Sequence, residues 1–112
     1  MLTFSEFERI CARQRERLVR GTPERHRLHD SATVVIVLAG RLQQLIGEHL
    51  RTAGTTPELS RAQASLKEAS GVTRWLQDRG RHASDDEMAA RLLVANGHVC
   101  DAVRELRTYI RA

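Results

Sequence analysis

The sequence predicts an all-α fold: one domain over residues 1–112, forming a bundle of four to five helices with a central apolar second helix. Three helix-start signals indicate this, Thr22-Pro23-Glu24, Thr56-Pro57-Glu58 and Ser84-Asp85-Asp86-Glu87. A Thr or Ser at the N-cap of a helix accepts hydrogen bonds from backbone N–H groups that have no partner within the helix. The acidic residues that follow it lie at the positive end of the helix dipole, where a negative charge is stabilising. Composition agrees, because 41% of the residues are hydrophobic but only 4% are aromatic. Aliphatic side chains must therefore fill the core, as is typical of packed helices.

The first helix is expected from about Ser5 to Arg20, with capping-box spacing both at Thr3 and at Ser5. One face of this segment is charged. The other carries an apolar stripe at helical spacing, interrupted by Gln14 and made of Phe4, Phe7, Cys11 and Leu18.

The second helix is expected to start after Thr22 and to continue to Arg51, with Gly54 beyond its end. Its apolar residues recur every seven positions and fill the positions between, at Leu28, Ala32, Val35, Ala39, Leu42 and Ile46. A helix that is apolar nearly all round needs neighbours on several sides. The second helix is therefore predicted to be the centre of the bundle.

The remaining helices are expected to start after Thr56 and Ser84. Ser70-Gly71 is a candidate break in the third helix, since glycine costs about 1 kcal/mol relative to alanine inside a helix. The fourth helix is expected to end at Asn96-Gly97, a pair suited to a left-handed cap, and a last helix to run from about His98 to Arg111.

The segment from Leu92 to Leu106, LLVANGHVCDAVREL, resembles the last two helices of a ubiquitin-associated or elongation-factor-Ts-type three-helix module. A leucine, an Asn-Gly turn, an Ala-Val pair and a final leucine carry the resemblance, which implies a helix–turn–helix corner. The ubiquitin-contacting Met-Gly-Phe turn of that family aligns with Arg81-His82-Ala83. No binding residues are therefore carried over from it.

The two cysteines, Cys11 and Cys100, lie in different predicted helices, without the spacing of a disulfide framework or a zinc site. We interpret both as buried, reduced thiols. The segment before Ile10 carries charges where a signal peptide would be apolar, and the longest apolar run is far below the ~20 residues that span a bilayer. A cytoplasmic protein without a membrane partner is expected.

Arginine dominates the charge: there are seventeen arginines and one lysine, and the net charge is +4. Seven of the arginines lie between Arg9 and Arg27. Arg13, Arg17 and Arg20 fall on successive turns, and we predict them to be the partner-binding face. The partner is expected to be a protein. The alternative is a basic nucleic-acid-binding regulator that uses the Arg9–Arg27 cluster, although no aromatic residues interleave there for base stacking.

No catalytic, metal or cofactor site is predicted. Arg20/His26 and Arg91/His98 come near the arginine–histidine spacing of HEPN-type nucleases, but Leu92 follows Arg91 where that family has a polar residue. The sequence therefore favours a small non-enzymatic interaction protein, an adaptor, chaperone-like or structural component. A homodimer is also expected, because the second helix offers more apolar surface than its neighbours can cover.

Overall fold

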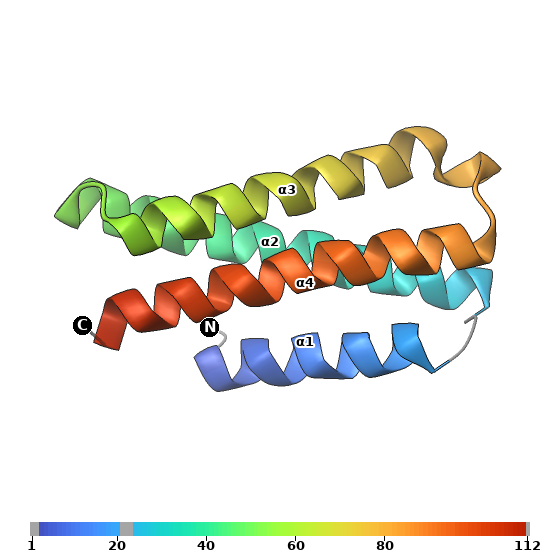
Figure 1. Ribbon diagram of the computed structural model, residues 1–112, viewed down its shortest axis with the longest axis horizontal. Helices are drawn as coiled ribbons and strands as arrows, with labels where there is room; N and C mark the ends of the chain where they lie inside the picture. Colours follow the sequence, from blue (N-terminus) through green and yellow to red (C-terminus); the bar gives the residue numbers. More distant parts are fainter. Residues whose placement is uncertain (1–2, 21–23, 112) are drawn as a thin grey trace.

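The computed structural model describes residues 3–20 and 24–111, and these residues form four α-helices joined by short connections, with no strand. The helices are α1 (Phe4–Val19), α2 (Arg25–Ala53), α3 (Pro57–Arg79) and α4 (Asp85–Arg111), and a single 3-10 turn, η1, occupies Gly80–His82. Successive helices run in opposite directions, so that α1 begins and α4 finishes at the same end of the molecule (Figure 1). The all-α prediction is confirmed, in an up-and-down arrangement.

Local capping explains where three helices begin. The hydroxyls of Thr3, Thr56 and Ser84 accept hydrogen bonds from the backbone N–H three residues further on, at 3.2, 3.2 and 3.1 Å. At the end of α2, Gly54 has a φ of 76°, a conformation that favours glycine. The cap position of α2 is Glu24, and the predicted Thr22-Pro23 signal lies outside the described residues.

The predicted end of a helix at Asn96-Gly97 is wrong. Helix α4 passes through this pair without interruption, and among the described residues only Gly54 is a glycine with positive φ. Buried residues continue on both sides of the pair, at Leu92, Ala95, Val99 and Ala102. Their burial outweighs the modest cost of a helical glycine. The helix–turn–helix corner implied by the resemblance to the ubiquitin-associated module is therefore absent.

The candidate break at Ser70-Gly71 is also absent, because α3 is continuous through it. Gly71 is exposed, and a side chain at this position would meet no atom within 4 Å. No turn or close approach of another segment uses the glycine. The described chain consequently contains four helices, at the lower end of the predicted range.

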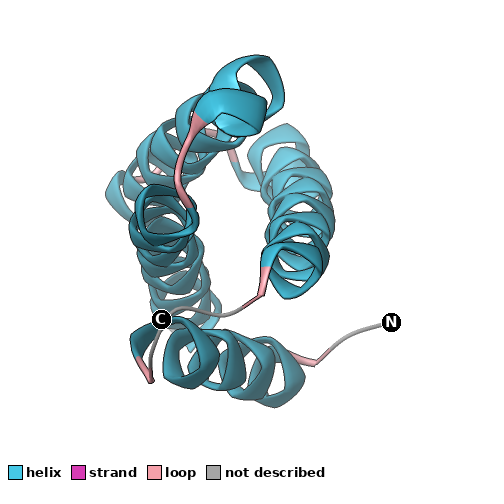
Figure 2. Ribbon diagram, turned by 90° about the vertical axis from the view of Figure 1, so that its right-hand side faces the viewer, coloured by secondary structure: helices cyan, strands magenta, loops and turns pink. Residues whose placement is uncertain are grey.

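Helix α4 packs against each of α1, α2 and α3, whereas α1 packs mainly against α4. In Figure 2, which looks along the bundle from its right-hand end in Figure 1, α1 lies across the base beneath the other helices. One buried cluster draws on all four helices and includes Phe7, Val35, Leu42, Leu66, Val99 and Leu106. A second, near the start of α4, includes Leu18, Leu28, Leu76, Met88 and Leu92. The central position of the second helix stays a prediction.

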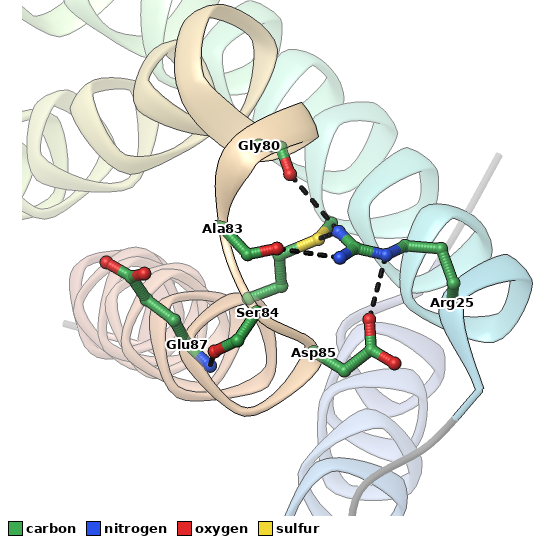
Figure 3. A network of polar contacts seen from close by, with 7 residues as sticks. Arg25, Gly80, Ala83, Ser84, Asp85 and Glu87 are labelled. Carbon is green, nitrogen blue, oxygen red and sulfur yellow. Dashed lines mark hydrogen bonds and ion pairs between the residues drawn. The ribbon is translucent and has the colours of Figure 1, made fainter.

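Arg25, at the start of α2, joins that helix to the corner between α3 and α4 (Figure 3). Its guanidinium donates to the backbone carbonyls of Gly80 (3.1 Å) and Ala83 (2.6 Å), contacts the sulfur of Met88, and lies 2.8 Å from a carboxylate oxygen of Asp85. The planar fork of an arginine can serve several acceptors at once. One side chain thus ties together the starts of α2 and α4.

Candidate functional site

The three arginines that the sequence predicts as a partner-binding face differ in what surrounds them. Arg13, Arg17 and Arg20 are exposed. Arg13 and Arg17, one turn apart, line a groove between α1 and α2, but Arg20 follows the last residue of α1 and does not line it. The structure therefore brings two of the three predicted residues to a common hollow.

This hollow, which we name the α1–α2 groove, has a volume of about 410 Å³. Its lining is mainly apolar, and it consists of Ile10, Arg13, Gln14 and Arg17 from α1 and Thr33, Val34, Val37 and Leu38 from α2. Val37 is 48% exposed although it is apolar. The groove exists because α1 turns its buried stripe towards α4 and leaves this side of α2 only partly covered.

Gln14 lies in the groove wall and is only 4% exposed. Its side-chain carbonyl oxygen, Oε1, accepts no hydrogen bond from the described residues. A buried polar atom without a partner costs about 1–3 kcal/mol, and such atoms are uncommon in folded proteins. The polar residue that interrupts the predicted stripe of the first helix thus presents an unused acceptor beside an apolar groove.

A second pocket, of about 590 Å³, lies between α1 and α4 and is lined by both cysteines, a relationship that sequence reasoning missed. Cys11 is buried, as predicted, whereas Cys100 is only half-buried. Charged side chains surround the thiols: Arg15, Arg104, Glu8 and Glu16 also line the pocket. Glu8 forms an ion pair with Arg107 of α4. We call this the thiol pocket.

The two cysteines affect each other's ionisation. Hydrogen bonding to Cys100, together with burial, raises the pKa of the Cys11 thiol. The same hydrogen bond lowers the pKa of Cys100, and the positive charges of Arg104 and Arg15 act in the same direction, against burial and Asp101. Cys100 is therefore the thiol that ionises more readily, and thiolate is the reactive form of cysteine.

Asn96 of α4 connects α4 to α1 beside the two cysteines. Its side-chain Nδ2 donates to the backbone carbonyl of Cys11 at 3.0 Å and lies 3.9 Å from the sulfur of Cys100. Asn96 is 1% exposed, and its Oδ1 accepts no hydrogen bond from the described residues. One buried amide thus contacts both cysteines.

Two further arginines of the Arg9–Arg27 cluster, and Arg91 outside it, have other surroundings. Arg15 faces the thiol pocket, and Arg25 is held by Asp85 and backbone carbonyls. The guanidinium of Arg91, one member of a nuclease-like pair, stacks 4.2 Å over the ring of Trp75. Among residues 3–20 and 24–111, no three His, Cys, Asp or Glu side chains converge as a metal site would require.

None of the described helices is both long and apolar enough to cross a bilayer. Comparison with known proteins found no match for this chain among family models, curated proteins or solved structures.

Proposed function

We propose that this protein is a small, non-enzymatic interaction protein that binds an acidic, amphipathic helix of a protein partner in the α1–α2 groove. The observation that carries the proposal is the composition of this groove. An apolar floor, two arginines one turn apart and a buried acceptor without a partner lie together between two helices.

The apolar part of the groove favours a helix as the occupant. A furrow between two helices accepts the apolar face of a third, whose anchors recur at i, i+3, i+4 and i+7. Val37 is 48% exposed and Val34 only partly buried, so both leave apolar area for such anchors. In this proposal the second helix, which the sequence predicts to be the centre of the bundle, also supplies the floor of the groove.

The charge at the groove favours an acidic partner. Arg13 and Arg17 are exposed, and no ion pair of either is present among the described residues. A guanidinium forms forked hydrogen bonds with carboxylates, which is one reason why arginine is enriched at interfaces.

A nucleic-acid-binding regulator is the alternative, and the groove supports it less well. A phosphate backbone needs a continuous basic surface, whereas Arg15 lines the thiol pocket instead of the groove and Arg25 is paired with Asp85. An apolar groove also offers nothing to a phosphate chain.

Fluorescence anisotropy with the full chain tests the proposal. The probes are a synthetic helical peptide with leucine anchors flanked by glutamate, the same peptide with lysine in place of glutamate, and a single-stranded oligonucleotide. The acidic peptide should bind at least about tenfold more tightly than the lysine peptide, a difference of about 1.4 kcal/mol. Val37→Asp and the pair Arg13→Glu/Arg17→Glu should each remove this binding.

The control variant is Arg41→Glu/Arg51→Glu, which reverses two exposed arginines of α2 that do not line the groove. It should bind the acidic peptide as the unmodified chain does. Equal binding of both peptides would contradict the proposal. Tight binding of the oligonucleotide with a steep salt dependence would replace it with the nucleic-acid function. If light scattering showed a dimer and Val37→Asp dissociated it, the occupant of the groove would be a second copy of the chain.

A further inference from the structure

The thiol pocket combines features that the proposed interaction function does not use. It brings together two cysteines that are far apart in the sequence, and both residues line the same hollow between α1 and α4. A cysteine that serves only as a core residue has no need of a second thiol, a buried amide and two arginines around it.

The exposure of the two thiols is unequal. Cys11 is 2% exposed and belongs to the core cluster that joins all four helices, whereas Cys100 is half-buried at the edge of that cluster. A reagent that enters the pocket therefore reaches the sulfur of Cys100 first. Cys11, in the same pocket lining, is almost fully covered.

We propose that Cys11 and Cys100 form a dithiol site that reacts with low-molecular-weight disulfides, with Cys100 as the attacking thiol and Cys11 as the resolving thiol. The product is an intramolecular disulfide that links α1 to α4. The volume of the pocket, about 590 Å³, gives a small disulfide room to approach Cys100.

The reaction has two exchange steps. The Cys100 thiolate attacks one sulfur of the small disulfide, the S–S bond breaks, and one small thiolate leaves and takes up a proton. Cys11 then loses its proton to solvent and attacks the Cys100 sulfur of the mixed disulfide, which expels the second small thiolate. In total, two protein thiols and one small disulfide become one protein disulfide and two small thiols. The protein is oxidised by two electrons, which the small disulfide accepts.

Electrostatics supports this order of attack. The hydrogen bond from Cys11 and the charges of Arg104 and Arg15 lower the pKa of Cys100 against the effects of burial and Asp101. Once Cys100 is part of a mixed disulfide it carries no negative charge. The largest cause of the raised pKa of Cys11 is then removed, while burial and Glu8 remain. The resolving thiol therefore ionises more easily after the first step than before it.

Asn96 positions the pair for the second step. Its bond to the Cys11 carbonyl, at 3.0 Å, holds α1 against α4, and its Nδ2 also lies 3.9 Å from the Cys100 sulfur one turn further along α4. A disulfide forms only when the two Cβ atoms lie close and point towards one another. Both cysteines line one pocket and contact one asparagine, which places them side by side for this step.

The test is to treat the reduced full chain with glutathione disulfide and to follow the products by intact-mass spectrometry. The unmodified chain should lose two hydrogens and accumulate no lasting glutathione adduct. Cys11→Ser should accumulate one stable adduct, since nothing resolves it. Cys100→Ser should react at least about tenfold more slowly, because the remaining thiol is buried and poorly ionised.

The same three proteins in guanidinium chloride are the control, since unfolding should make Cys11→Ser and Cys100→Ser react at similar rates. Circular dichroism melts check that both variants fold. In a glutathione redox buffer, the folded chain should favour the internal disulfide at least about tenfold more than the unfolded chain, because the fold holds the thiols together. Equal native rates for the two single variants would overturn the proposal, as would glutathione adducts on both cysteines of the unmodified chain.

Discussion

The side-chain amide of Asn96, in the middle of α4, donates a hydrogen bond to the backbone carbonyl of Cys11, in the middle of α1, at 3.0 Å. This bond is buried and joins the first and the last helix of the bundle. It also explains why a residue typical of helix ends occurs within a continuous helix. The asparagine is buried between two helices, and there its side chain donates to a carbonyl of the neighbouring helix.

Asn96→Ala should therefore destabilise the fold by about 0.5–1.5 kcal/mol, the usual net contribution of one hydrogen bond. Asn96→Asp should cost more, because it places a carboxylate, which cannot donate, beside the carbonyl of Cys11 and away from water. Urea unfolding followed by circular dichroism measures both. Gln63→Ala, at an exposed position of α3, is the control and should change the unfolding free energy little. If Asn96→Asp were as stable as the unmodified chain, the bond would not be present in solution.

Glycine-to-alanine substitutions test the continuity of α3 and α4. Gly71 and Gly97 are exposed, helical and open to an added methyl group. Gly71→Ala and Gly97→Ala should each stabilise the fold by about 0.4–1 kcal/mol. Gly54→Ala should destabilise it, because the φ of 76° at this position is unfavourable for alanine. Thermal melts compare the three variants. A lower melting temperature for Gly97→Ala would contradict the continuous helix and would favour the turn predicted at Asn96-Gly97.

The central position of the second helix is tested by a neighbouring pair of residues on it. Leu42 is 0% exposed, whereas Arg41 is exposed. Leu42→Ala should cost about 2–5 kcal/mol, and Arg41→Ala should cost little. Leu106→Ala, at a position of α4 that is also 0% exposed, is the comparison. A loss at Leu42 that is far smaller than the loss at Leu106 would make α4 the central helix.

Arg25→Lys should weaken the corner at which α2 meets α4 almost as much as Arg25→Ala. A lysine ammonium is a compact charge and cannot serve Gly80, Ala83 and Asp85 from one planar group. Asp85→Asn should cost less, because this carboxylate is 39% exposed and its ion pair is screened by salt. Urea unfolding at low and high salt separates the two contributions. Retention of full stability in Arg25→Lys would show that charge alone holds the corner.

Reversing all three arginines Arg13, Arg17 and Arg20 to glutamate should leave the melting temperature nearly unchanged, since exposed charges contribute little to stability. Arg20→Glu alone should not affect binding in the α1–α2 groove, because Arg20 does not line it. The comparison of single and triple variants in the peptide assay checks this. A loss of binding in Arg20→Glu equal to that in Arg13→Glu/Arg17→Glu would extend the contact surface beyond the groove.

Features that depend on neighbours in sequence could be predicted, and features that depend on distant residues could not. The caps at Thr3, Thr56 and Ser84 involve backbone groups three residues away, so their spacing is visible in the sequence. Asn96 failed as a predicted helix end because its partner is a carbonyl on another helix.

The candidate sites follow the same division. Arg13 and Arg17 could be chosen because successive turns of one helix share a face. The approach of Cys11 to Cys100, by contrast, depends on how α1 crosses α4, which no local pattern encodes. Gln14 stood out as a break in an apolar stripe, but its unused acceptor became visible only with the groove around it.

The reliance of α1 on α4 has a consequence for biosynthesis. The ribosome makes α1 first and α4 last, yet the contacts that hold α1, through Asn96 to Cys11 and through Arg107 to Glu8, come from α4. Helices α2 and α3 are neighbours in sequence and pack against each other, so their association closes only a short loop. The apolar stripe of α1 therefore stays largely uncovered until α4 has emerged from the ribosome. The contact between α1 and α4 thus cannot form until the whole of this bundle has been synthesised.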